Sequence, residues 1–158
     1  MSGDLHCGDC GSTNIVGPER VATRSLPQLK RYHAMIKAAL HHWPEAHARK
    51  YGIANKEDLR KWLQMRAGHR EVAAHVELAG MSKEQALMIA EASIKAAGSY
   101  AVPLIHGDVL VIFRPKSIAF HKLGHTEFCL LNDEVDEAIF QVTGTRGKQM
   151  LKEMERAA

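Results

Sequence analysis

One helical stripe between Ser25 and Pro44 limits the possible folds of this chain more than any other feature. Five apolar residues recur at spacings of three and four: Leu29, Tyr32, Ile36, Leu40 and Trp43. This is the period of one helix face, so the stripe predicts a helix that packs against a core. Ser25 is a suitable N-cap. Since the residue before a proline disfavours the α region, we expect the helix to end at Trp43-Pro44.

Helical and strand patterns follow one another along the rest of the chain. Helical patterns cover residues 56–67, 82–98, 124–142 and 145–156, the second opening with a capping box, Ser82-x-x-Gln85. Strand patterns cover residues 70–79 and a hairpin, 100–105 with 109–113, in which Pro103 favours a sheet edge. Residues 44–54 are expected to be a loop, and residues 13–16 and 20–24 to form a short hairpin.

The mixture of patterns predicts an α+β fold in which about four to five helices pack on a small antiparallel sheet. The chain has 158 residues, enough for one domain that needs no disulfide to fold. We expect residues 19–158 to form this single domain and residues 1–18 to be an N-terminal extension with a cysteine knuckle. No apolar stretch is long enough for a membrane span, and the N-terminus lacks the pattern of a secretory signal. The expected location is therefore the cytoplasm, without membrane contact.

The knuckle is predicted from a Cys-x-x-Cys motif, in "HCGDCGS", that resembles the first half of a zinc ribbon. A structural zinc site needs four ligands, and the chain has no second motif of this kind. His121, His125 and Cys129 are spaced by four, so they would share one face of a helix. The expected zinc ligands are Cys7, Cys10, His125 and Cys129. His6 can replace a cysteine, and the alternative is an unmetallated pair with Cys129 in the core.

The charges are distributed unevenly along the chain. The net charge is +3, but residues 1–70 carry twelve lysines and arginines against six acids, and residues 71–158 carry nine against twelve. Lysine and arginine supply the phosphate contacts that dominate affinity for nucleic acid, so the first part favours an anionic partner. A solvated basic face is the alternative. The expected phosphate-binding residues are Arg24, Lys30, Arg31, Lys37, Arg60, Lys61, Arg66 and Arg70.

Aromatic residues are interleaved with these charges, and exposed aromatics can stack on unpaired bases. Tyr32, Trp43 and Trp62 fall on the apolar stripes, so we expect core packing for them. The chain has no GxSxG, HExxH or P-loop motif, and no catalytic residue is predicted. The acids of "NDEVDEA", residues 132–138, are expected to be a solvated helix face, with a divalent cation site as the alternative.

Three segments resemble, in order, a domain family of unknown function found in phages and prophages. They are "RSLPQLKRYHAMIKAALHHWPE", "NKEDLRKWLQMRAGH" and "RPKSIAFHKLGHTEFCLLNDEV", within residues 24–135. The family shares a basic helix, a "WPE" corner, an "AGH" helix end and a "PKSIAF"-type strand. The first segment also resembles NinB-type phage recombination proteins, which bind single-stranded DNA, through Arg24, Ser25, Leu26, Gln28 and Tyr32. Leu29 stands where the NinB-type segment has asparagine.

The charge pattern and the resemblance together predict a phage or prophage accessory protein of recombination or replication. It would bind nucleic acid, single-stranded or junction DNA, without catalysis. One alternative is an inhibitor or adaptor that docks on a protein complex of the host. Another is a metal-dependent nuclease that uses the cysteine and histidine set or the acids of residues 133–137. The sequence leaves the oligomeric state open.

Overall fold

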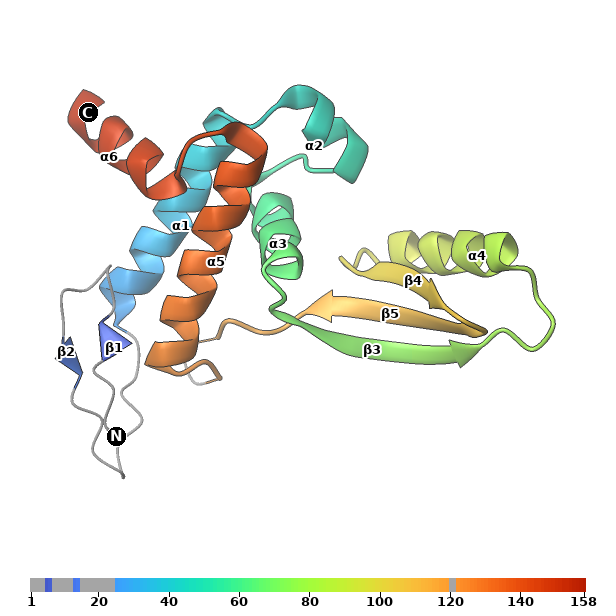
Figure 1. Cartoon of the computed structure of the whole chain (residues 1–158). Helices are drawn as coiled ribbons and strands as arrows, with labels where there is room; N and C mark the ends of the chain where they lie inside the picture. Colours follow the sequence, from blue (N-terminus) through green and yellow to red (C-terminus); the bar gives the residue numbers. More distant parts are fainter. Residues whose placement is uncertain (1–4, 7–12, 15–24, 120–121) are drawn as a thin grey trace. The chain divides into compact units, whose positions relative to one another are not determined.

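The computed structural model describes residues 5–6, 13–14, 25–119 and 122–158, which fall into two compact units (Figure 1). The first unit takes in Met1–Ala67 and Ser117–Ala158, and the second is Gly68–Lys116. Helices dominate the first unit, and an antiparallel sheet with one helix forms the second. The predicted α+β class with a small antiparallel sheet is confirmed. The expected boundary between residues 18 and 19 lies outside the described residues.

The first unit is built on four helices around one apolar core. They are α1 (Leu26–His41), α3 (Lys56–Arg66), α5 (His125–Thr143) and α6 (Gly147–Ala157). The Tyr32 ring on α1 meets the Phe128 ring on α5 edge to face, with centroids 5.4 Å apart. Both side chains are almost fully buried. Aromatic pairs in this geometry stabilise a core beyond the area that they bury.

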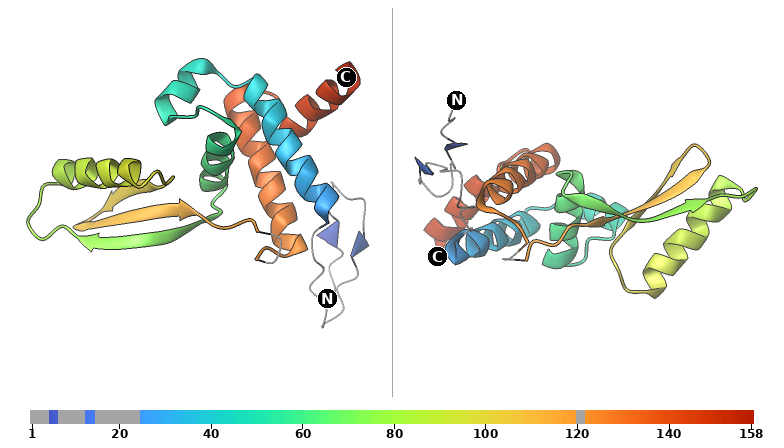
Figure 2. Two further views of the ribbon diagram at one scale, coloured as in Figure 1. Left: turned by 180° about the vertical axis from the view of Figure 1, so that it is seen from behind. Right: turned by 90° about the horizontal axis from the view of Figure 1, so that it is seen from below.

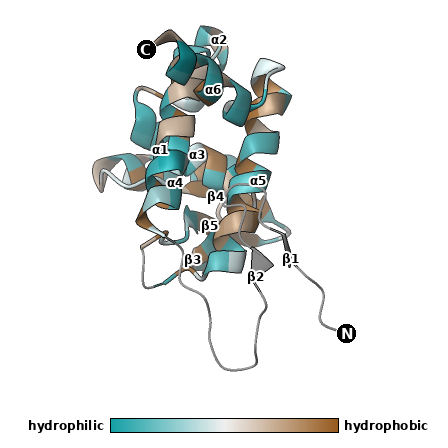
Figure 3. Ribbon diagram, turned by 90° about the vertical axis from the view of Figure 1, so that its left-hand side faces the viewer, coloured by the Kyte–Doolittle hydropathy of each residue, from teal (hydrophilic) through white to brown (hydrophobic). Residues whose placement is uncertain are grey.

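Helix α1 follows the predicted stripe closely. The Ser25 hydroxyl accepts a hydrogen bond from the Gln28 backbone N–H, and the Gln28 side chain accepts one from the Ser25 backbone N–H, so a capping box opens the helix. Tyr32, Ile36 and Trp43 are buried. The helix ends at His41, just before the expected Trp43-Pro44 boundary. Hydrophilic and hydrophobic residues alternate along it (Figure 3).

A short helix, α2 (Glu45–Tyr51), replaces the loop expected for residues 44–54. Pro44 precedes it, and Glu45 in its first turn pairs with Arg49 one turn later, N to O 2.5 Å. An acid followed by a base at this spacing supports a helix and also suits its dipole. Gly52 ends it in a left-handed conformation. The expectation of a loop for residues 44–54 was wrong, because the charge pattern between Pro44 and Gly52 supports a short helix.

The second unit is a three-stranded antiparallel sheet in the order β3-β5-β4. Its strands are β3 (Arg70–Glu77), β4 (Val102–His106) and β5 (Val109–Pro115), so the predicted strand and hairpin are confirmed. Pro103 stands on β4, at an edge of the sheet as expected. Helix α4 (Lys83–Ala96), which opens with the predicted capping box, packs on one face of this sheet (Figure 2).

One expectation about short strands needs correction, and another, the hairpin of residues 13–16 with 20–24, stays a prediction. Strand β2 (Thr13–Asn14) pairs with β1 (Leu5–His6), whereas the expected partner, residues 20–24, lies outside the described residues. The "PKSIAF" strand that the resemblance implies is not formed by residues 116–119, which follow the end of β5 without regular structure.

Candidate nucleic-acid interface and candidate metal ligands

Helix α1 presents a basic surface to solvent, opposite the stripe that enters the core. Lys30, Arg31 and Lys37 are exposed, and so is His41 in the last turn. We call these four residues the α1 basic face. No acid stands within the helix, and no ion pair among the described residues engages these lysines or this arginine. The face therefore keeps its positive charge available to an anionic ligand.

Arg60 does not belong to an open phosphate-binding surface. Only 14% of its side chain is exposed, and its guanidinium lies 2.9 Å from the Glu57 carboxylate. It also donates a hydrogen bond to the amide oxygen of the fully buried Gln64. The hydrogen bond from Arg60 is the main reason that the pKa of Glu57 is lowered. The prediction that Arg60 contacts phosphate is therefore corrected, because the residue satisfies a buried amide.

The remaining predicted phosphate contacts are dispersed. On α3, Lys61 is half-buried and Arg66 is exposed. Arg70 opens β3 in the second unit, and its guanidinium lies 4.8 Å from the centroid of the Phe113 ring. Arg24 lies outside the described residues. Within the described part of the chain, α1 is thus the element that brings several of the predicted cations to one surface.

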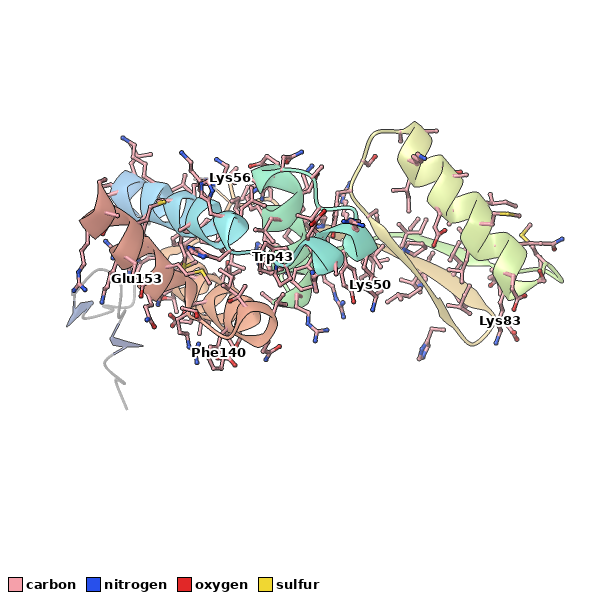
Figure 4. The ribbon with its side chains drawn as sticks, turned by 90° about the horizontal axis from the view of Figure 1, so that it is seen from above. Trp43, Lys50, Lys56, Lys83, Phe140 and Glu153 are labelled. Carbon is pink, nitrogen blue, oxygen red and sulfur yellow. The ribbon has the colours of Figure 1, made fainter. Side chains whose placement is uncertain are left out.

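Four aromatic rings gather where α2 approaches α3. Trp43, His47, Tyr51 and Trp62 form a chain of ring contacts with centroids 4.5–5.7 Å apart. Figure 4 labels Trp43 after α1 and Lys50 on α2. The predicted core position of Tyr32 and Trp43 is confirmed, and Trp62 is partly buried against the same core. We call the four rings the aromatic cluster.

His47 joins the cluster through its ring nitrogen. Its Nδ1 accepts a hydrogen bond from the Trp43 indole N–H over 3.1 Å. Burial, and to a lesser degree the nearby charge of Lys50, lowers the pKa of His47. Sequence reasoning missed this contact because residues 44–54 were expected to be a loop. The signal was the spacing of Trp43, His47 and Tyr51, each four residues after the last. His47 and Tyr51 share one side of α2, and Trp43 lies just before that helix.

Two of the four predicted zinc ligands are described, and the structure brings them together. His125 and Cys129 lie one turn apart at the start of α5, with 3.6 Å between Nε2 and Sγ. The Cys129 sulfur is disulfide-bonded in the structure. Cys7 and Cys10 lie outside the described residues. Within the described ranges, no group of three metal-binding side chains is assembled.

The acids of residues 133–137 have structural partners. The Asp133 carboxylate lies 2.8 Å from the Lys148 ammonium, and the Glu137 carboxylate lies 2.6 Å from the Arg146 guanidinium. Asp136 is buried and accepts a hydrogen bond from the Lys148 backbone N–H. The expectation of a solvated face is therefore wrong for Asp136. These pairings hold α6 against α5 and leave the nuclease hypothesis without support from this cluster.

The chain matches no family model, no curated protein and no solved structure. The resemblance to phage proteins therefore stays a prediction. None of the described helices is long and apolar enough to cross a membrane.

Proposed function

We propose that this protein binds single-stranded nucleic acid without catalysing a reaction, and that the α1 basic face is its contact surface. The observation that carries the proposal is the lack of neutralising partners for Lys30, Arg31 and Lys37 among the described residues. By contrast, Arg49, Arg60 and Arg146 are each paired with an acid.

The spacing of the basic residues on α1 supports contact with the extended sugar-phosphate backbone of a single strand. Lys30 and Lys37 are two helical turns apart on one side of α1, a separation of about 10 Å along the axis. His41 continues the same line one turn later. Lysines in such a row can meet phosphates of one strand, which gives affinity without base readout. The rigid core side of α1 holds the row in place.

The cellular role in this proposal is that of an accessory protein in phage or prophage recombination or replication. The resemblance of the α1 segment to NinB-type proteins, which bind single-stranded DNA, favours it. Docking on a host protein is the second candidate. It is favoured by the exposed Met88 and Ile89 on α4, in a unit with as many acids as basic residues. This role predicts a stoichiometric protein complex and weak binding of DNA.

Fluorescence anisotropy with a labelled oligothymidine, titrated at several salt concentrations, tests the proposal. Each phosphate contact in a single strand contributes about 0.7 to the slope of log K against log salt. The triple variant Lys30→Gln, Arg31→Gln, Lys37→Gln should therefore lower the slope by about 2 and weaken binding at low salt. The matched control, Lys83→Gln, Lys95→Gln, Lys152→Gln, removes the same charge from α4 and α6.

The control variant should bind as the wild type does. Absence of wild-type binding at low salt, or an equal loss in the control variant, would exclude the α1 basic face as a nucleic-acid interface. Circular dichroism checks that both variants keep their helices. The substituted side chains are exposed, and surface changes of this kind alter stability by about 0.5 kcal/mol or less.

A further inference from the structure

Strand β3 leaves one of its two edges open (Figure 1). It stands at the end of the order β3-β5-β4, so β5 is its one neighbour among the described strands. Most residues along β3 are exposed, and the side chains of Val72 and Val76 are 52% and 48% exposed. An edge strand presents a row of backbone N–H and C=O groups that can pair with another strand. This open edge is eight residues long, and no proline interrupts it.

The opposite edge of the same sheet is less suited to pairing. Strand β4 is five residues long and contains Pro103. Proline supplies no backbone N–H, and an edge strand tolerates it where that group would face solvent. Short strands and prolines are common ways in which sheets protect an edge from further pairing. The two edges therefore differ, and β3 is the one that can accept a further strand along its whole length.

A β-bulge on β3 decides which of its side chains share a face of the sheet. The ladder with β5 shifts just after Val72, so Val72 stands opposite Phe113 and His75 stands opposite Val111. Phe113 and Val111 are two residues apart on β5 and therefore lie on one face. Residues that stand opposite each other in a ladder point to the same face, so Val72 and His75 also share it. By the same rule Arg70 and Glu77 belong to this face.

The sequence of β3 is complementary to itself in the antiparallel direction. When two copies of the strand run antiparallel and are centred on its middle, Arg70 stands opposite the partner's Glu77. Val72 then stands opposite the partner's His75, which belongs to the same face of the sheet. A shift by one residue would set residues of opposite faces against each other. The centred register therefore pairs all eight residues and joins opposite charges at both ends.

The charges that this register uses are available. No ion pair among the described residues engages Arg70 or Glu77, and both side chains are exposed. The other acid of the strand, Glu71, is already paired with Arg114 of β5 over 2.7 Å. Its charge is thus balanced within the sheet and does not oppose the contact between Arg70 and the partner's Glu77.

We propose that two copies of this chain pair antiparallel through their β3 edges and form one continuous sheet. The interface is isologous, so it contains the contact between Arg70 and the partner's Glu77 twice. Backbone hydrogen bonds between the strands supply affinity, as in other cases of strand addition. Opposite charges that face each other across antiparallel strands stabilise this pairing and fix its register. The proposal is independent of nucleic-acid binding by the α1 basic face.

Exchange of the charges at the two ends of β3 tests the pairing. Arg70→Glu and Glu77→Arg each place two contacts between like charges in the interface. Sedimentation equilibrium of the full chain should show a monomer–dimer equilibrium for the wild type, and a Kd raised about tenfold or more in each variant. An equimolar mixture of the two variants restores an acid opposite a base at both contacts. Heterodimers should therefore form in the mixture with about the wild-type Kd.

The matched control exchanges charge on α4, which contacts β4 at the other edge of the sheet. Glu91 and Lys95 are exposed there, and Glu91→Arg and Lys95→Glu change the net charge as the two β3 variants do. Each control variant should dimerise as the wild type does, and mixing the two should give no tighter dimer. This separates pairing at β3 from general attraction between oppositely charged chains.

A double variant keeps the test decisive if a single variant folds poorly. Arg70→Glu with Glu77→Arg in one chain restores both contacts, so it should dimerise as the wild type does. Hydrogen exchange should become slower at the backbone amides of β3 as the protein concentration rises. A wild-type chain that is still monomeric at about 1 mM overturns the proposal. So does a dimer whose Kd both single variants leave unchanged, or a mixture that associates no more tightly than the separate variants.

Discussion

The indole N–H of Trp43 donates a hydrogen bond to the Nδ1 atom of His47, which joins the turn after α1 to the helix α2. A ring nitrogen accepts a hydrogen bond only while it carries no proton, so the contact requires neutral His47. Burial around the imidazole lowers its pKa in the same direction. The aromatic cluster is therefore a pH-sensitive part of the first unit.

We predict that His47 makes the folded state less stable as the pH falls. Because the pKa of His47 is lowered on folding, the unfolded chain binds more protons between that value and the unfolded pKa of about 6.5. The stabilisation is complete above the unfolded pKa and is lost as the pH falls toward the folded pKa. Urea unfolding between about pH 5 and pH 7.5 gives the free energy of unfolding at each pH. This free energy should depend on pH more steeply in the wild type than in His47→Gln.

The control for this measurement is His41→Gln, which removes an exposed histidine of α1. If the unfolding free energy of His47→Gln depended on pH as that of the wild type does, the pKa of His47 would be the same in the folded and unfolded states. Trp43 fluorescence offers a probe of the cluster itself.

Arg60 is predicted to act on stability and not on nucleic-acid binding. In Arg60→Met the buried amide oxygen of Gln64 loses its charged donor, which should lower the free energy of unfolding by about 1–3 kcal/mol. The ion pair with the half-exposed Glu57 contributes little to this loss. Chemical denaturation gives the value, and Lys61→Met is the neighbouring control, expected within about 0.5 kcal/mol of wild type. Full stability combined with weaker DNA binding would instead make Arg60 a phosphate contact.

Asp136 is predicted to cap α6 from the neighbouring helix. Its Oδ1 accepts a hydrogen bond from the Lys148 backbone N–H over 3.0 Å, while Arg146, the residue before the helix, provides no side-chain cap. Asp136→Ala should cost about 1–2 kcal/mol, the usual range for a lost cap. Hydrogen exchange should show α6 opening more often.

Asp136→Asn retains an oxygen that can accept the Lys148 N–H, so it is the matched control. The backbone amides of α6 should exchange more slowly in this variant than in the alanine variant. If both variants lost the same free energy of unfolding, the effect would come from the charge of Asp136 and its 3.5 Å contact with Arg146, and not from the cap.

Gly147 is predicted to be required for the approach of α6 to the core. A Cβ atom there would lie 2.7 Å from the Ile139 Cδ1 and 2.9 Å from the Met35 Cγ, and both side chains are buried. Gly147→Val should lower the free energy of unfolding by about 1–3 kcal/mol through overpacking. Thermal and urea unfolding measure it against Gln149→Val, which places the same side chain at an exposed position of α6. Similar stability of the two variants would mean that the Ile139 and Met35 side chains can move aside without cost.

Local signals accounted for most elements of the fold. The capping boxes at Ser25 and Ser82 and the edge position of Pro103 depend on neighbouring residues alone, so sequence reasoning placed them correctly. Helix α2 was missed although its pairing of Glu45 with Arg49 is equally local. For the candidate site, the exposed positions of Lys30 and Lys37 followed from the helical period of the stripe.

The sequence by itself determined the amphipathic pattern of α1, because a helix face depends only on residue spacing and the core must be apolar. The tertiary structure decided which basic side chains remain available to an anionic ligand. Arg60 and Lys37 both carry a positive charge, yet Arg60 donates a hydrogen bond to the buried Gln64 and Lys37 is exposed to solvent. Likewise Asp136 is one acid among several, and its burial follows from the arrival of α6 at its side. Arg60 and Gln64 are neighbours on α3, but the burial of Gln64 depends on how α3 packs against the core. The contact of Asp136 with Lys148 joins α5 to α6, and no local period encodes it.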